Sequence, residues 1–223
     1  MNLRLDWCSH EAAKYAVENW HYSKRMPMPP LLKIGVWEDG LFVGCIIYGT
    51  GAGQSTNGNK YGLPKRYAIA ELVRVALNGH KVPVSKMLAV SIKMVKRNSP
   101  NLKLLISFAD VAEGHHGGIY QATNWVYTGQ TEETVLTYHG GRWKHTREIA
   151  AKTAFGVTRN KVNADNLPKK KMPGKHRYLY PLDDEMRKQI EPLRQPYPKR
   201  PKQATSPVQG DSGGAAPTRT LQI

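Results

Sequence analysis

The sequence lacks the features that mark membrane proteins and disulfide-rich secreted proteins. No apolar run is long enough to cross a bilayer as a helix. The first ten residues have neither the apolar core nor the small-residue cleavage site of a secretory signal. The two cysteines, Cys8 and Cys45, cannot build a disulfide framework and suit a reducing compartment. These absences predict a cytoplasmic protein with no membrane partner.

Acidic residues are scarce relative to basic ones. The 223 residues include 33 Lys and Arg but 17 Asp and Glu, which gives a net charge of +16. The segment 142–178 alone holds 11 basic and two acidic residues. Protein surfaces usually mix the two signs, so this segment predicts a polyanionic partner, most directly nucleic acid. A surface that is merely soluble is the alternative.

Apolar residues are also scarce in the last part of the chain, where five prolines and three glycines follow from Pro196 onwards. Such a segment cannot bury enough surface to offset the entropy cost of ordering, and disorder is therefore expected. We divide the chain into a core over 1–141, a basic extension packed on that core over 142–195, and a disordered tail over 196–223.

Hydrophobic periodicity in the core predicts a mixed α/β sheet. Strands are expected at 3–7, 32–37, 41–48, 70–77, 102–109 and 125–129. Helices are expected at 9–20, 85–98 and 117–124. The stretch 102–109 is almost wholly apolar, which is typical of a central strand covered on both faces.

The step from strand 70–77 into helix 85–98 is a candidate phosphate site, because such a helix presents unpaired N–H groups and a positive dipole end. Its candidate binding residues are Val75, Leu77, His80, Val82, Ser85 and Lys86. An ordinary strand-to-helix turn is the alternative. On the strand before it, Glu71 and Arg74 are three positions apart, so we expect them to face opposite sides of the sheet.

The second candidate site follows strand 102–109, because open α/β sheets bind ligands beyond the carboxyl ends of their strands. Ser107 and Asp110 precede the pair His115 and His116, and Tyr120 follows. Asp110 can act as a base or accept a hydrogen bond from a substrate amine, and the histidines can shuttle protons. Adjacent histidines chelate a metal poorly on a helix. Acid–base chemistry or substrate contact, a metal site and plain loop histidines all stay open.

Two smaller groups are notable. The loop after the first helix carries His21, Tyr22, Lys24 and Arg25 between prolines and the helix end. Such a loop often covers an active site, although basic loops are also common on surfaces. A second group of aromatic residues, which can stack on bases or anchor the core, lies among basic residues: Trp143, Tyr178 and Tyr180.

The order of these elements resembles the GNAT acyltransferase fold, in which the strand and helix corresponding to 70–98 hold the pyrophosphate of acyl-CoA. Five separated motifs resemble the Mom family of bacteriophage DNA-modification proteins more specifically. They are NWHYS at 19–23, ELVRV at 71–75, SFAD at 107–110, GHHGGIYQA at 114–122 and KHRYLYPL at 175–182. One departure from the GNAT pattern is that residues 82–85 contain no glycine, and Pro83 supplies no N–H group.

The resemblance implies a GNAT-like enzyme that adds a methylcarbamoyl-type group to the exocyclic amine of adenine in DNA. This modification would protect phage DNA from restriction inside the host cell. Acetyl-CoA is the implied donor, and a bound iron has been proposed for the family. The implied partner is double-stranded DNA with the adenine flipped out, and a homodimer is a further expectation. The alternatives are an N-acetyltransferase acting on a protein or small amine, and a non-enzymatic DNA-binding module.

On this hypothesis Asp110 holds or deprotonates the amine and Tyr120 protonates the departing thiolate. Ser107 and His116 form the polar wall, and His115 is a further catalytic candidate. His21 and Tyr22 close the pocket, and Arg74 holds a donor carbonyl or phosphate. The residues expected to bind DNA are Lys24, Arg25, Arg142, Lys144, His145, Arg147, Lys169, Lys170, Lys171, Lys175 and Arg177.

Overall fold

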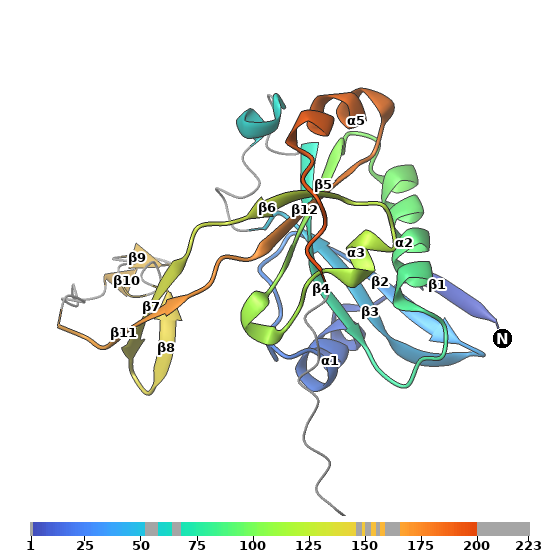
Figure 1. Ribbon diagram of the computed structural model, residues 1–223. Helices are drawn as coiled ribbons and strands as arrows, with labels where there is room; N and C mark the ends of the chain where they lie inside the picture. Colours follow the sequence, from blue (N-terminus) through green and yellow to red (C-terminus); the bar gives the residue numbers. More distant parts are fainter. Residues whose placement is uncertain are drawn as a thin grey trace, which may run out of the picture.

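The structure is a computed structural model that describes residues 2–51, 58–63, 68–145, 149, 153–154, 157–158 and 166–199. Its main sheet has seven strands (Figure 1). In spatial order they are β1 (Leu3–Trp7), β2 (Leu31–Glu38), β3 (Leu41–Gly49), β4 (Ile69–Leu77), β5 (Leu104–Ala109), β12 (His176–Pro181) and β6 (Val126–Gln130). Neighbouring strands are antiparallel except β4 and β5, which are parallel. The predicted mixed α/β sheet is confirmed.

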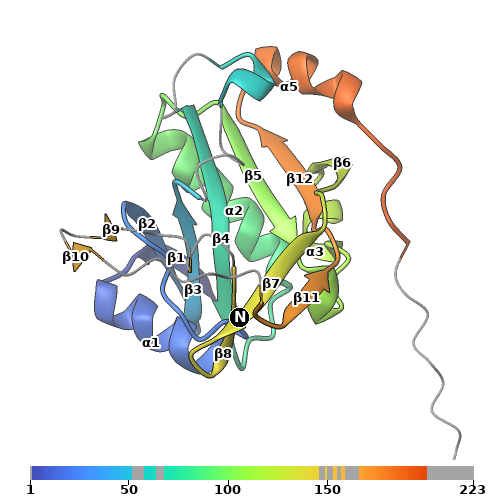
Figure 2. The same cartoon turned by 90° about the vertical axis from the view of Figure 1, so that its left-hand side faces the viewer.

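Helices cover both faces of this sheet, so the core has three layers (Figure 2). One face packs against α1 (His10–Trp20) and α5 (Asp184–Ile190), and the other against α2 (Val84–Asn98) and α3 (Gly118–Gln121). The described residues also form three short 3-10 helices: η1 (Gly58–Tyr61), η3 (Val111–Glu113) and η4 (Glu191–Leu193). Within the described ranges, no helix has both the length and the apolarity needed to cross a membrane.

The first two helices follow the sequence pattern closely. Ser9 accepts a hydrogen bond from the backbone N–H of Ala12 at 3.1 Å, which begins α1 where the cap was expected. The apolar face of α2 is buried with Leu88, Ile92 and Val95 at most 3% exposed. Because every residue of β5 except Phe108 is buried, this strand is the covered central strand that its composition predicts.

The parallel pairing of β4 and β5 is short. It joins Ile69–Glu71 to Leu104–Ile106, although β4 continues to Leu77 and β5 to Ala109. On its other side β4 carries a bulge, because Tyr48 pairs with Leu72 while the adjacent Ile47 pairs with Arg74. A bulge bends and twists its strand. The two strands therefore diverge towards their carboxyl ends.

The bulge also corrects one expectation from the sequence. Glu71 and Arg74 were expected on opposite faces because they are three positions apart. Val73 is the extra residue between them, so the alternation of side chains shifts by one. Glu71 and Arg74 both lie on the face opposite to Leu72.

The segment 142–195 was expected to be an extension packed on the core. The structure differs, because part of this segment belongs to the core sheet itself. Its strand β12 lies inside the main sheet between β5 and β6. A second, three-stranded sheet, which we call the arm, is inserted between β6 and β12 and projects from the core (Figure 1). The arm consists of β7 (Thr134–His139), β8 (Arg142–His145) and β11 (Lys169–Met172); β9 (Thr153–Ala154) and β10 (Val157–Thr158) pair separately.

The predicted tail also begins later than expected. Residues 196–199 are ordered against the core, where the Tyr197 hydroxyl donates to the Trp125 carbonyl at 2.6 Å and its ring stacks on Tyr178. The Pro198 carbonyl accepts from the Gln121 amide at 3.3 Å. The rest of the predicted tail, 200–223, lies outside the described residues.

Gly117 fixes the approach of α3 to β12. Its φ is +83°, and an added Cβ would lie 2.3–2.6 Å from the Tyr178 ring and hydroxyl. That hydroxyl donates to the His116 carbonyl at 2.6 Å, so the loop before α3 is tied to the sheet at this point. Gly114 has a similar φ of +71° but no atom within 4 Å of the added Cβ.

We predict that Gly117→Ala lowers the free energy of unfolding by about 2–4 kcal/mol, because left-handed strain and steric overlap add. Gly114→Ala should lose about 1 kcal/mol from backbone strain alone. Urea unfolding of both variants measures the difference. Equal losses in the two variants would show that the Gly117 contact with Tyr178 is not tight.

Candidate active site

A cavity of about 940 Å³ lies where β4 and β5 diverge. Leu72, Val75 and Tyr120 belong to the α2 side of the sheet, whereas Trp20 and Val73 belong to the α1 side. The cavity therefore reaches through the opening between the strands. Its described lining consists of Trp20, His21, Tyr22, Leu72, Val73, Arg74, Val75, Val84, Phe108, Ala109 and residues 114–120.

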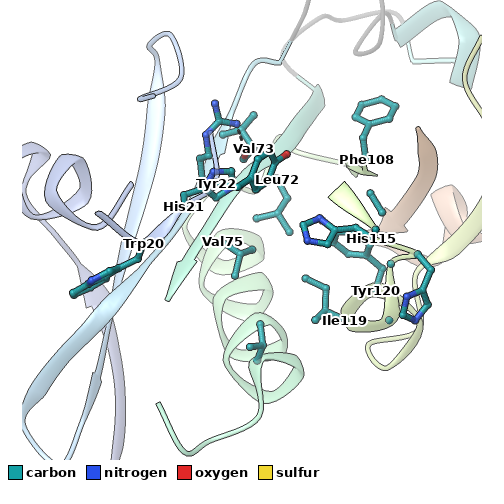
Figure 3. A pocket seen from close by; sticks show the side chains of 17 residues that line it. Trp20, His21, Tyr22, Leu72, Val73, Val75, Phe108, His115, Ile119 and Tyr120 are labelled. Atoms are coloured by element: carbon teal, nitrogen blue, oxygen red, sulfur yellow. Dashed lines mark hydrogen bonds between the residues drawn. The ribbon is translucent and has the colours of Figure 1, made fainter. Parts of the chain in front are cut away.

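Two groups of side chains face each other across this cavity (Figure 3). His21 and Tyr22, from the end of α1, lie on one side. His115, Ile119 and Tyr120, from the loop before α3 and from α3 itself, lie on the other. The two candidate regions from the sequence, 21–25 and 107–120, thus meet at one place.

Tyr120 sits at the buried end of this wall and is 8% exposed. Its hydroxyl oxygen lies 2.8 Å from Ser107 Oγ, and Ser107 Oγ lies 3.0 Å from the Leu72 carbonyl oxygen. Ser107 has one hydroxyl proton and therefore donates to one of these oxygens at a time. The chain of contacts links α3 to both diverging strands, because Ser107 is on β5 and Leu72 is on β4.

Burial raises the pKa of Tyr120 to about 12. The phenolate would be poorly solvated among the rings of Trp125 and Tyr178, which lie 5.2 and 5.0 Å away. The Tyr120 hydroxyl therefore keeps its proton at neutral pH. It can donate a hydrogen bond or a proton, and it cannot act as a base in its resting state.

His21 is held as a neutral donor. The ring is 8% exposed, and burial, with Arg74 and His115 adding positive charge nearby, lowers its pKa to about 4. Its Nδ1 accepts a hydrogen bond from the backbone N–H of Ser23 at 3.0 Å. A neutral imidazole that accepts at Nδ1 carries its proton at Nε2. His21 therefore presents an N–H donor rather than a base.

Asp110 is placed differently from the other candidates. It does not line the cavity, and its two carboxylate oxygens contact Lys175 Nζ at 2.6 Å and the Ala112 N–H at 3.1 Å. The pairing follows from the register, since His176 lies opposite Ala109 and the preceding Lys175 thus reaches Asp110. The carboxylate is 16% exposed and fastens β12 to the end of β5.

Arg74 lines the cavity and also shapes it. Its Nε and Nη2 donate to the Arg25 carbonyl at 3.2 and 3.1 Å, and its Nη1 donates to the Val73 carbonyl at 2.6 Å. The guanidinium thus holds the loop after α1 against the bulge of β4. His115 and Tyr22 are in edge contact across the mouth, with ring centroids 5.7 Å apart.

The turn before α2 is already occupied by a carboxylate. Glu38 is 6% exposed and accepts from the N–H groups of Lys81 and Val82, both at 2.8 Å. These bonds lower the pKa of Glu38, so it stays ionised. A diphosphate cannot use the same two N–H groups. The N–H groups of Val84 and Ser85, in the first turn of α2, have no partner within that helix.

Five of the seven residues expected to bind the cofactor therefore lie away from the cavity. Val75 and Arg74 line it, and Val84 brings the start of α2 to its wall. The other five candidates do not line the cavity: Leu77, His80, Val82, Ser85 and Lys86. The turn before α2 therefore does not offer its N–H groups to a diphosphate, and Val84 is the residue of α2 that reaches the cavity.

The residues expected to bind DNA fall into three places. Lys24 and Arg25 are at the loop beside the cavity, where Lys24 Nζ donates to the Asn19 carbonyl. At β12, Arg177 is bound to the hydroxyl and carbonyl of Thr128 at 2.8 and 2.9 Å, and Lys175, just before the strand, is paired with Asp110. Six others lie on the arm: Arg142, Lys144, His145, Lys169, Lys170 and Lys171. Arg147 lies outside the described residues.

The aromatic candidates separate clearly. Tyr178 is fully buried and Tyr180 packs against the same core, so both anchor the core. Trp143 is 43% exposed on the arm.

A metal site finds no support in the described part of the chain. No group of three or more His, Cys, Asp or Glu side chains there is arranged to hold an ion. The iron suggested by the family resemblance does not fit these residues, and no chemical step is assigned to it.

Sequence reasoning missed Glu38 and Lys175 as structural partners. Glu38 was not among the expected site residues, and its partners are 43 and 44 positions away. Lys175 was read as a DNA contact. Phe108 and Trp20 also line the cavity. Both lie within the family motifs, but nothing in the residues next to them predicts that they face a cavity.

Comparison with known proteins gives a match to one family. The model of the Mom protein family matches residues 2–199. The methylcarbamoylase mom of Escherichia phage Mu is 27% identical over 145 residues, which cover 64% of this chain. The aligned part spans 60% of the relative's length.

Two solved structures are also similar. The spermidine/spermine N-acetyltransferase SpeG from Vibrio cholerae is 9% identical, with 83% of this chain and 96% of that chain covered and a TM-score of 0.46. The putative acetyltransferase yncA from Salmonella typhimurium, solved with acetyl-CoA, is 11% identical, with 82% and 96% covered and a TM-score of 0.45.

We predict that the His21 ring stays neutral, with its proton on Nε2, down to about pH 5. Two-dimensional NMR of the ring nitrogens should give a titration midpoint near 4. The unfolded ring titrates near 6.5, so the unfolded state binds more protons between these values and acidification destabilises the fold. A midpoint above 6, or a proton on Nδ1, would contradict the donor role.

Proposed function

The chain belongs to the Mom protein family, and on this premise we propose that it adds a methylcarbamoyl-type group to the exocyclic amine of adenine in DNA. The observation that carries this proposal is the cavity between β4 and β5. Its described lining holds Arg74, three histidines and a protonated tyrosine, and it contains no carboxylate. Such a lining suits an electron-rich base and a negatively charged donor.

The two substrates approach from opposite faces of the sheet. The adenine, flipped out of the duplex, enters past His21 and Tyr22 on the α1 side. The acyl donor lies along Val75 and Val84 on the α2 side. They meet at the opening between the strands, where positioning alone lowers the barrier for attack.

An acyl thioester such as acetyl-CoA supplies an activated carbonyl and a thiol leaving group when bound. The N–H groups of Val84 and Ser85 and the charge of Lys86 would hold its diphosphate. In the acyl-transfer step the amine nitrogen bonds to the carbonyl carbon, the C–S bond breaks and CoA leaves as its thiol. A methylcarbamoyl group contains a nitrogen that an acetyl group lacks, so acyl transfer is the first of the steps that build it. The chain's own groups manage the protons of this first step. The Nε2–H of His21 donates to an oxygen on the α1 side, where charge develops during attack.

Tyr120 is the acid of this scheme. Its hydroxyl is protonated at neutral pH, because burial raises its pKa, and Ser107 holds the hydroxyl in place. The amine must lose a proton, and His115, exposed at the cavity wall, takes it. Asp110 is not given this role, because Lys175 and the Ala112 N–H occupy its oxygens.

We predict that Tyr120→Phe lowers the modified fraction of deoxyadenosine at least tenfold, since general acid catalysis contributes about 10²–10⁴-fold. Ser107→Ala should lower it less, because the phenol remains. The measurement is mass spectrometry of nucleosides from plasmid DNA after expression. Tyr61→Phe, at a tyrosine that is 4% exposed in a different core cluster, is the matched control.

The outcomes separate the function from the assignment of residues. Unmodified deoxyadenosine in the presence of soluble wild-type protein would contradict the proposed function. Full modification by Tyr120→Phe would leave the function standing and remove Tyr120 as its acid.

The donor can be tested without turnover. We predict that Glu38→Gln binds CoA several-fold more tightly than wild type in calorimetry at low salt, because it removes a negative charge beside the start of α2. Asp6→Asn, an equal charge change on the edge strand β1, should leave the affinity unchanged. Absence of CoA binding by both wild type and Glu38→Gln at millimolar concentration would exclude CoA as the donor.

A further inference from the structure

The tip of the arm carries an exposed aromatic pair. β7 and β8 are joined by Gly140 and Gly141, whose φ values of +59° and +77° are those of a tight two-residue hairpin turn. One pair back from the turn, Tyr138 lies opposite Trp143. Their rings are 42% and 43% exposed and meet edge to face, with centroids 5.4 Å apart. The turn holds this pair at the end of a stiff projection.

The two faces of the arm differ in chemistry. Side chains directly opposite each other in antiparallel strands share a face, and so do residues two apart. Tyr138 and Trp143 therefore lie on one face, together with Leu136, His145, Lys170 and Met172. The other face carries four cationic side chains: Arg142, Lys144, Lys169 and Lys171.

The arm is held firmly relative to the cavity. The Thr131 N–H donates to the Lys175 carbonyl and the Lys175 N–H donates to Thr131 Oγ1, both at 2.9 Å. An added Cβ at Gly174 would overlap the Thr131 carbonyl, so the two connections to the core are in close contact. Lys175 is also paired with Asp110, four residues before the loop that lines the cavity mouth. These hydrogen bonds and the ion pair thus fix the base of the arm beside the cavity mouth.

An exposed aromatic pair on a projecting hairpin fits a partner with flat, stackable surfaces. The four cations on the opposite face favour a polyanion as the partner, and the net charge of +16 favours the same kind of partner. Duplex DNA combines both features. Removing one base from its stack leaves the neighbouring bases exposed, and proteins that distort DNA often fill such a gap with an apolar side chain.

We propose that the arm tip is a wedge that enters the duplex beside the target adenine. Trp143, backed by Tyr138, stacks on the base left exposed when the adenine leaves the helix. The cationic face lies along the phosphate backbone and fixes the register of the arm. This inference rests on the proposed function, because it assumes that DNA is the substrate.

The test measures binding to two duplexes by fluorescence anisotropy over a series of salt concentrations. One duplex is fully paired, and the other has a mismatch at the target adenine, which lowers the cost of flipping. Trp143→Ala should weaken binding to the paired duplex about 5- to 100-fold, the range for removing one base stack. The salt dependence should stay unchanged, because the variant keeps every cation that faces a phosphate. Trp143→Phe should restore most of the affinity.

Two controls separate stacking from charge and from folding. Trp7→Ala changes an equally exposed tryptophan, 43%, on the edge strand β1, and should bind as wild type. The double variant Lys169→Ala, Lys171→Ala should reduce the slope of log K against log salt by about 0.9 for each phosphate that it no longer neutralises. Its preference for the mismatched duplex should persist, which shows that the arm is folded.

The outcomes distinguish this inference from the function on which it rests. If Trp143→Ala and Tyr138→Ala bind both duplexes with wild-type affinity while wild type modifies DNA, the wedge is wrong and the function stands. A change in salt slope with Trp143→Ala would also overturn the wedge, because it assigns Trp143 to a phosphate-binding surface. If wild type neither binds nor modifies DNA, the function itself fails.

Discussion

The extra residue in β4 is the constraint on which the site depends. A strand with regular pairing on both sides would leave no opening between β4 and β5, because parallel neighbours lie about 4.8 Å apart along their whole length. The bulge at Val73 accompanies the end of that pairing after Glu71 and turns Arg74 towards the loop after α1. The cavity lining comes from these two diverging strands and the segments packed against them.

The polar groups around this opening follow one electrostatic pattern. Donors line the cavity, while two carboxylates near it are bound by other groups: Asp110 by Lys175 and Glu38 by the turn before α2. Burial reinforces the pattern, because it keeps Tyr120 protonated and His21 neutral. A site of this kind favours negative charge that develops during a reaction, but its described lining offers no buried base. Any proton acceptor must therefore come from the solvent side, where His115 lies.

Sequence patterns sufficed for elements whose signals are local. The cap at Ser9, the apolar face of α2 and the run in β5 each need a few neighbouring residues to be recognised. Sequence patterns did not reveal that β12 lies inside the main sheet. Its neighbours β5 and β6 are about 50 to 70 positions earlier in the chain, and the residues around β12 are basic. The dependence on distant parts of the chain also explains which features of the site could be predicted. Residues 21–22 and 107–120 were found as motifs, whereas Glu38 and the bulge at Val73 exist only through pairing with distant strands.

Because the arm is inserted between two core strands, its basic side chains are held in a fixed position relative to the cavity. A basic tail joined by a flexible linker would raise the local concentration of DNA without orienting it. Here β6 and β12 enter and leave the arm through short connections that bond to each other, and Lys175 pairs with Asp110 rather than with a phosphate. Part of the net charge therefore stabilises a rigid joint. If DNA is the substrate, as proposed, the remaining cations of the arm would contact its backbone from a fixed position beside the cavity and so set which base faces the opening.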